Sequence, residues 1–377
     1  MIKKILFFII ITSTLTIHAQ ERCGAEIITN QMKRNNPDYA LARSKVNIET
    51  EQWIKRNANH NKKTIITIPV VVHVVWETNQ QNISDAQIQS QIDVLNEDYR
   101  RTNIDQINTP NVWQNIAADC EIEFCLATID PNGQSTNGIN RVSTTHGSFG
   151  MNNDIHYSSS GGADAWPNDD YLNIWVCDVG NSGLLGWATP PSGSIGNGDG
   201  LVIGYRYFGR VGTLQAPYNK GRTATHEIGH WLNLDHVWGP DFGPNTGCNG
   251  DDGVTDTPNQ EEWNYNCPGF PHNANACGTA NGDMFMNYMD YTNDACMNLF
   301  TNGQKARMIA AINLYRPNML NHNLCSGSAN TLEINTPKKH LIKIVDVLGR
   351  ENTKLNLNIP LFYIYNDGSV EKKIIIQ

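Results

Sequence analysis

The sequence HEIGH at residues 226–230, with His236 six residues further on, is the feature that most constrains how this chain can fold. Histidines four residues apart on a helix differ by about 40° around the axis and lie about 6 Å apart along it, so they face the same side. His236 cannot share that face of a continuous helix, so the helix must end and the chain must fold back. Asn233 lies at the position where a residue with left-handed backbone angles would end the helix. The pattern therefore predicts a helix, a turn and three converging imidazoles.

Three neutral imidazoles, from His226, His230 and His236, leave a fourth position open, which is the pattern of a catalytic zinc site rather than a closed structural one. Glu227 lies beside the first of them and is placed to take a proton from a water molecule at the metal. The alternative is that the loose pattern HExxH arose by chance on an amphipathic helix. The third histidine and the turn residue count against chance, and we expect zinc-dependent hydrolysis.

The segment HEIGHWLNLDH, residues 226–236, resembles the extended zinc motif of the metzincin metallopeptidases, and more narrowly of the pappalysin family. Most members carry Gly where this chain has Asn233, a change that Asn tolerates because it can adopt left-handed backbone angles. The segment NYMDY at 287–291 resembles the Met-turn of the same family. The resemblance implies that Met289 forms an apolar floor under the ligands and that Tyr291 approaches the zinc or the developing oxyanion. A plain core methionine is the alternative for Met289.

The resemblance covers roughly residues 65–316 and extends to the acidic loop after the zinc helix. Family members bind calcium near the catalytic cleft, and hard cations take clustered carboxylate and carbonyl oxygens. The resemblance therefore implies a calcium site, and a solvated acidic turn is the alternative. The candidate ligands are Asp251, Asp252, Asp256 and an oxygen of Thr257.

A substrate preference is also implied, because bacterial relatives favour a basic residue just after the scissile bond. Asp290 and Asp294 are the candidates for an acidic pocket wall, although Asp294 equally suits a turn cap. If the preference holds, the basic residues between Arg56 and Lys63 are a plausible place for self-activation.

Nine cysteines fit an exported protein with disulfides and leave one unpaired. Cys23 is the candidate for the unpaired thiol, since a thiolate can fill the open zinc position and hold the enzyme latent. The sequence RCG around it resembles the cysteine switch of pro-forms in this family, and an ordinary disulfide cysteine is the alternative. By resemblance, two disulfides cross-link the loop between the zinc helix and the Met-turn: Cys248–Cys277 and Cys267–Cys296. The pairing of four others stays open: Cys120, Cys125, Cys177 and Cys325.

A signal peptide is predicted for residues 1–19, because two lysines precede an apolar run and Ala19 offers a small residue for cleavage. The run is shorter than the about 20 residues of a spanning helix, so no membrane span is expected. A net charge of −9 offers no basic surface for nucleic acid. We expect a secreted monomer whose partners are protein or peptide substrates.

Residues 20–62 are polar and are interpreted as a pro-segment, and residues 63–325 as the metallopeptidase domain. The β-branched run 65–76 predicts a strand buried on both faces. Further strands are predicted at 122–129, 172–178 and 200–207, and helices after Ser84, near Arg222 and after Thr301. Strands separated by helices indicate an α/β (α+β) fold with a mostly parallel twisted sheet. By resemblance this is a metzincin-type domain, and the helix that begins near Arg222 is its active-site helix.

Residues 326–377 change in character, from a polar linker to a small β unit with hairpin turns. This unit resembles the C-terminal sorting domains of type IX secretion, which implies the secretion machinery as a partner and leaves retention on the cell surface open. A β-appendage that binds carbohydrate or shields a sheet edge is the alternative.

The resulting hypothesis is a secreted zinc-dependent endopeptidase, and two other functions stay open. An adhesin-like binding protein could keep the zinc fold without turnover, but intact Glu227, Met289 and Tyr291 count against that function. Zinc amidases that act on cell-wall amides are disfavoured by the Met-turn and the third histidine.

Overall fold

The computed structural model describes residues 22–58, 64–181, 183–193, 196–239, 247–325, 341–351, 360–365 and 370–374. The chain forms two compact units, residues 1–327 and 328–377. The expected signal peptide, the basic segment 59–63 and the linker after Cys325 lie outside the described residues.

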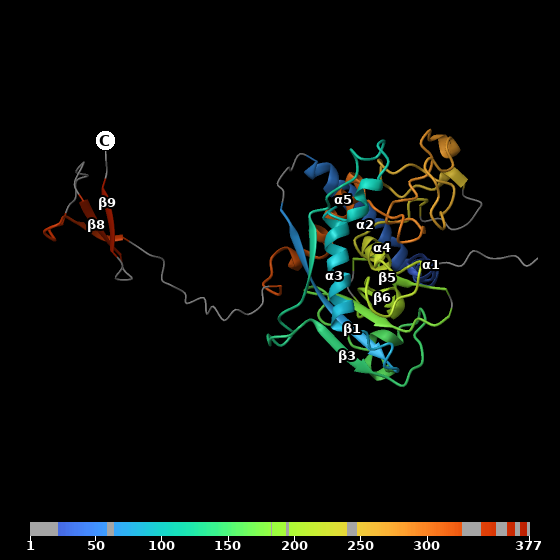
Figure 1. Ribbon diagram of the computed structural model, residues 1–377, viewed down its shortest axis with the longest axis horizontal. Coiled ribbons are helices and arrows are strands. Elements are labelled where there is room, and N and C mark those ends of the chain that lie inside the picture. The colour runs from blue at the N-terminus through green and yellow to red at the C-terminus, as the bar shows by residue number, and fades with distance from the viewer. Residues whose placement is uncertain are drawn as a thin grey trace, which may run out of the picture. The chain divides into compact units, whose positions relative to one another are not determined.

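The first unit is built on a sheet with the strand order β2-β1-β4-β6-β5, and β3 also pairs with β1 (Figure 1). Every pairing is parallel except that of β5 with β6. The mostly parallel α/β sheet predicted from the sequence is therefore confirmed. The strands are β1 Ile66–Trp76, β2 Ile122–Leu126, β3 Ile139–Ser143, β4 Leu172–Cys177, β5 Gly186–Ala188 and β6 Leu201–Gly204.

Helices cover one face of this sheet: α3 (Asp85–Tyr99), α4 (Arg222–Trp231) and α5 (Asn302–Tyr315). Alternate residues of β1, such as Val70 and Val72, pack in one core cluster with side chains from all three helices. Val75, which points to the other face, belongs to a second cluster built around Trp175 and the preceding loops. A β-branched run buried on both faces is what this two-sided packing requires.

The predicted helix starts are confirmed by their caps. The Ser84 side chain accepts a hydrogen bond from the Gln87 backbone N–H, and Thr301 forms a reciprocal capping box with Gln304. These caps fix the residues at which α3 and α5 begin.

The polar segment before β1 is helical, which the sequence did not predict. It forms α1 (Ala25–Asn35) and α2 (Pro37–Asn57), and α2 packs against α5. Asn36 caps α2 with its side chain, and Pro37 occupies the first turn, where a missing N–H costs nothing. Residues expected to form a pro-segment therefore pack on the catalytic unit as ordered helices.

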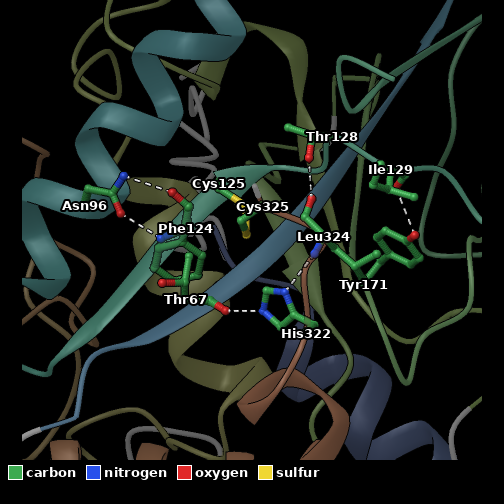
Figure 2. Close-up of a disulfide and its surroundings, with 10 residues drawn as sticks. All are labelled: Thr67, Asn96, Phe124, Cys125, Thr128, Ile129, Tyr171, His322, Leu324 and Cys325. Carbon is green, nitrogen blue, oxygen red and sulfur yellow. Dashed lines mark hydrogen bonds between the residues drawn. A yellow bond between two sulfur atoms is a disulfide. The ribbon is translucent and has the colours of Figure 1, made fainter. Parts of the chain in front are cut away.

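A disulfide between Cys125 and Cys325 ties the end of the first unit to β2 (Figure 2). Around it, the Leu324 carbonyl accepts hydrogen bonds from the Thr128 N–H and hydroxyl, and His322 contacts the Thr67 carbonyl. The other two disulfides, Cys248–Cys277 and Cys267–Cys296, are the pairs implied by the family resemblance. Within the described residues, the free cysteines are Cys23, Cys120 and Cys177, all buried, so three cysteines are unpaired rather than the one expected.

The second unit contains a small antiparallel sheet in the order β7-β8-β9. Its strands are β7 Leu341–Val345, β8 Pro360–Tyr365 and β9 Val370–Ile374. The three strands predicted for this part of the chain are present.

Candidate metal centre

Helix α4 presents the zinc motif inside the protein, and every one of its residues is buried. It ends where Asn233 adopts φ 70°, and the Leu234 N–H then bonds back to the Gly229 carbonyl at 2.9 Å. This is the left-handed turn predicted from the sequence. The turn returns the chain so that His236 faces His226 and His230.

The three imidazoles converge through their Nε2 atoms, which lie 3.1 to 3.3 Å apart. The Nδ1 of His226 lies 2.7 Å from the Tyr288 carbonyl oxygen, and that of His230 lies 2.8 Å from the Leu234 carbonyl oxygen. A carbonyl oxygen only accepts, so both Nδ1 atoms carry the proton and both Nε2 atoms present lone pairs. Facing lone pairs repel one another unless they share a cation.

Zinc fits this arrangement. A tetrahedron with Zn–N bonds of about 2.0–2.1 Å has an edge of about 3.3 Å, close to the observed separations. Burial, and then the neighbouring imidazoles, lower the pKa of all three histidines well below the ordinary value, which keeps them in the neutral form that binds metal. Within the described part of the chain, Cys23 and these histidines are the one group of three or more His, Cys, Asp or Glu side chains able to hold an ion.

Cys23 is the fourth member of the group, and all four ligand atoms lie within 4.8 Å of one another. Its thiol donates to the Glu227 carboxylate at 3.4 Å. The backbone around it lies along the edge strand β5, since the Gly24 N–H bonds to the Gly186 carbonyl and the Leu185 N–H to the Arg22 carbonyl. The N-terminal segment therefore passes directly across the metal-binding group.

Glu227 is fully enclosed beside the first histidine, with 1% of its surface exposed. Burial raises its pKa to about 8, and the hydrogen bond from Cys23 opposes that shift. A cation held by the histidines would attract the negative charge of Glu227 and so favour its carboxylate form.

The Met-turn lies against α4 as the resemblance implies. A Cβ atom added to Gly229 would lie 2.4 Å from the Met289 sulfur, so glycine allows the Met-turn to approach this closely. The Tyr291 ring centroid lies 5.0 Å from that of His236 and 5.8 Å from that of His226. The side chains of Met289 and Tyr291 are both buried.

The two candidate acidic residues of the specificity pocket have different surroundings. The Asp290 carboxylate accepts from the side chain of Gln260 and from both the backbone and side chain of Asn264, so it anchors the preceding loop. Asp294 accepts from the Lys220 N–H at 2.7 Å, and both carboxyl residues line a pocket beside the metal-binding group. Burial raises the pKa of each carboxyl to about 6.

Arg22 lines the same pocket as Asp290 and Asp294. Its guanidinium donates to the Tyr291 carbonyl and lies over the rings of Tyr218 and Tyr265, 4.4 and 4.5 Å from their centroids. The sequence identified this arginine only as a neighbour of Cys23, because nothing local reports a contact with a residue so far along the chain.

The residues predicted to bind calcium are not brought together as one site. Asp252 accepts from the Thr257 hydroxyl and the Val254 N–H, whereas Asp256 accepts from the Thr301 hydroxyl and the Gly303 N–H at the start of α5. The Asp251 carboxylate accepts from the Gly253 N–H. Each carboxylate already accepts hydrogen bonds from protein donors, so the calcium prediction is not supported.

Comparison with known proteins agrees with this geometry. Residues 156–313 match the family model described as pregnancy-associated plasma protein-A. An extracellular metalloprotease of Arthroderma otae is 31% identical over 262 residues, which is 67% of this chain and 79% of the relative. One of Pyricularia oryzae is 28% identical over 319 residues, which is 81% of this chain and 93% of the relative.

Solved structures agree as well. A Tannerella forsythia promirolysin mutant has a TM-score of 0.70 and 47% identity, over 80% of this chain and 97% of that one. Mature mirolysin of Tannerella forsythia in complex with a cleaved peptide has a TM-score of 0.64 and 51% identity, over 69% of this chain and 99% of that one. The chain is therefore a zinc metalloendopeptidase and belongs to the pappalysin family of the metzincins.

Proposed function

We propose that Glu227 is the general base of peptide-bond hydrolysis at this centre. The observation that carries the proposal is the convergence of three neutral imidazoles, with facing Nε2 lone pairs, directly beside this carboxylate. Bound zinc, held by the three histidines, would supply a Lewis acid that polarises the scissile carbonyl and makes water acidic enough to attack near neutral pH. Glu227 would take the proton of the attacking water and pass it to the leaving amine. Tyr291, against the His236 ring, would stabilise the oxyanion through its phenol.

The test compares the protein without residues 1–62 with its Glu227→Gln variant on casein and a peptide library. Chelator-sensitive cleavage should be lost in the variant while its zinc content stays the same. A variant that cleaves as fast as the parent would exclude this role of Glu227.

Latency through Cys23 is the second part of the proposal. The thiol lies within the metal-binding group, and the segment around it pairs with edge strand β5, where an extended peptide substrate would add. A thiolate at the fourth position would exclude water from the metal until residues 20–62 are removed. Cys23→Ser should raise cleavage of a short peptide by the full chain, whereas Cys120→Ser, at another buried free cysteine, should not. Equal activity of the two variants would contradict the switch.

A preference for a basic residue after the scissile bond is supported by the position of Arg22. The protein's own arginine lies against aromatic rings at a pocket that Asp294 also lines, and a substrate arginine would find the same partners there once the segment leaves. Asp290 is the weaker candidate for this charge, because its carboxylate already accepts three hydrogen bonds from Gln260 and Asn264.

Secretion is proposed from the predicted signal peptide and from relatives that are named extracellular metalloproteases. No helix among the described residues is long and apolar enough to cross a membrane. We assign residues 326–377 a role in outer-membrane sorting, which the small three-stranded sheet supports. Deletion of these residues should leave the protein in the cell envelope on fractionation, and unchanged release would reject the role.

A further inference from the structure

The three zinc ligands differ in what orients them. His226 and His230 each have a backbone carbonyl of the catalytic unit at Nδ1, at 2.7 and 2.8 Å. The Nδ1 of His236 instead lies 3.2 Å from the Glu26 carboxylate, which belongs to helix α1 of the N-terminal segment. The third ligand is thus oriented by a side chain from outside the zinc motif.

Glu26 is held in place for this contact. It lies in the first turn of α1, three residues after Cys23, and only 8% of its surface is exposed. The His236 ring also stacks on Trp238, with centroids 4.3 Å apart and planes 13° from parallel. Stacking fixes the plane of the ring but does not decide which nitrogen carries the proton, and a carboxylate at Nδ1 does.

We propose that Glu26 is a positioning residue for the metal centre: it accepts the Nδ1 proton of His236 and so leaves the Nε2 lone pair directed at zinc. The inference rests on the proposed latent form. Helix α1 and the residues just before it would then strengthen metal binding in two ways, through Cys23 as a ligand and through Glu26 as the hydrogen-bond partner of a ligand. Removal of the segment would take away both, so the latent protein would hold zinc more tightly than the active one.

The expected size of the effect follows from the general behaviour of such partners. A carboxylate hydrogen-bonded to a ligating histidine fixes its tautomer and raises its basicity, and loss of the carboxylate typically weakens metal binding 10- to 100-fold. The two contributions of the segment are chemically independent, since one is a coordinate bond and the other a hydrogen bond.

The test uses the full chain carrying Glu227→Gln, so that it does not process itself. Into this parent we would introduce Glu26→Ala, and separately Glu51→Ala, which removes an exposed carboxylate of the same segment that pairs with Lys55. Zinc affinity is measured by competition with a chromophoric chelator. Cobalt(II) at saturating concentration reports the thiolate of Cys23 through its charge-transfer absorption, independently of turnover.

Glu26→Ala should bind zinc about 10- to 100-fold more weakly than the parent and keep the thiolate–cobalt band, while Glu51→Ala should match the parent. Unchanged zinc affinity in Glu26→Ala would overturn the inference. Weaker binding together with loss of the band would also overturn it, because the segment would then have undocked. A parent without the band would contradict the Cys23 ligand of the proposed function, and the zinc titration would still decide the role of Glu26.

Discussion

The Arg43 guanidinium on α2 donates a hydrogen bond of 2.8 Å to the side-chain oxygen of Asn233, the residue that turns the chain between the second and third histidines. The Asn233 amide in turn donates to the Thr50 hydroxyl at 3.2 Å. Most relatives are expected to carry glycine at this position, and glycine would make neither contact. The asparagine therefore serves the turn through its backbone and the N-terminal helices through its side chain.

The first prediction concerns this contact. Asn233→Gly should keep the left-handed turn but weaken the docking of α2, because a hydrogen bond to a charged group typically contributes about 1.5–3 kcal/mol. A double-mutant cycle with Arg43→Ala, measured by chemical unfolding of the full chain, should give a coupling energy in that range. Additive effects of the two substitutions would mean that the contact contributes nothing.

The second prediction concerns the close approach of the Met-turn to α4. Gly229→Ala should destabilise the protein by about 1–3 kcal/mol, because the added methyl would lie 2.4 Å from the Met289 sulfur. In a Met289→Ala background the same change should stabilise it by up to about 1 kcal/mol, since alanine is the better helix former. Thermal unfolding of the four proteins checks both signs, and a uniform sign in both backgrounds would reject the steric explanation.

The third prediction tests the specificity pocket. Asp294→Asn should lower kcat/KM for peptides with arginine after the scissile bond by about 10- to 100-fold relative to peptides with leucine there, because a charge-assisted contact of about 1.5–3 kcal/mol is lost. The amide oxygen can still accept from the Lys220 N–H, so the local fold has a partner. Asp290→Asn is the matched control, and it should leave the arginine-to-leucine ratio unchanged. An equal fall for both peptides would place the specificity elsewhere.

The fourth prediction is a pH dependence that arises away from the metal. His73 is buried between Asn140, which donates to its Nδ1, and Asn173, which accepts from its Nε2, and burial lowers its pKa to about 4. The unfolded chain binds this proton near pH 6.5, so the unfolded state takes up more protons between pH 6.5 and 4. The contribution of neutral His73 to the free energy of unfolding is therefore complete above about pH 6.5, and it falls by about 3 kcal/mol as pH drops through this window.

The check is chemical unfolding of zinc-free His73→Gln and zinc-free parent between pH 4 and 7. Glutamine does not titrate and can keep a donor toward Asn173, so the fall in unfolding free energy should be smaller by about 3 kcal/mol in the variant. Parallel pH profiles for the two proteins would rule out His73 as the cause.

The elements that the sequence predicted are those with a local signature. The β-branched run of β1, the cap at Ser84 and the capping box at Thr301 are properties of a few neighbouring residues, and all three lie where expected. The left-handed turn at Asn233 follows from motif geometry in the same way.

The features that the sequence could not predict depend on distant contacts. Edge strand β5 is three residues long, and the Glu26–His236 contact joins residues 210 positions apart. The calcium prediction is not supported, for a related reason: Asp256 lies in an acidic stretch, but its carboxylate accepts a hydrogen bond at the start of α5, 45 residues further along. A cluster of like residues in sequence says nothing about which donors each side chain will meet.

The disulfide between Cys125 and Cys325 has a mechanical consequence. It closes a loop of 200 residues that contains the zinc helix, the acidic loop and the Met-turn. Tension applied to the chain beyond Cys325 would pass through the sulfur–sulfur bond into β2, and from there toward the N-terminus, without stretching the loop. The three histidines and the Met-turn lie inside this loop, so they would be shielded from that load if the protein were pulled by its tail, whereas Cys23 and Glu26 lie on the loaded path.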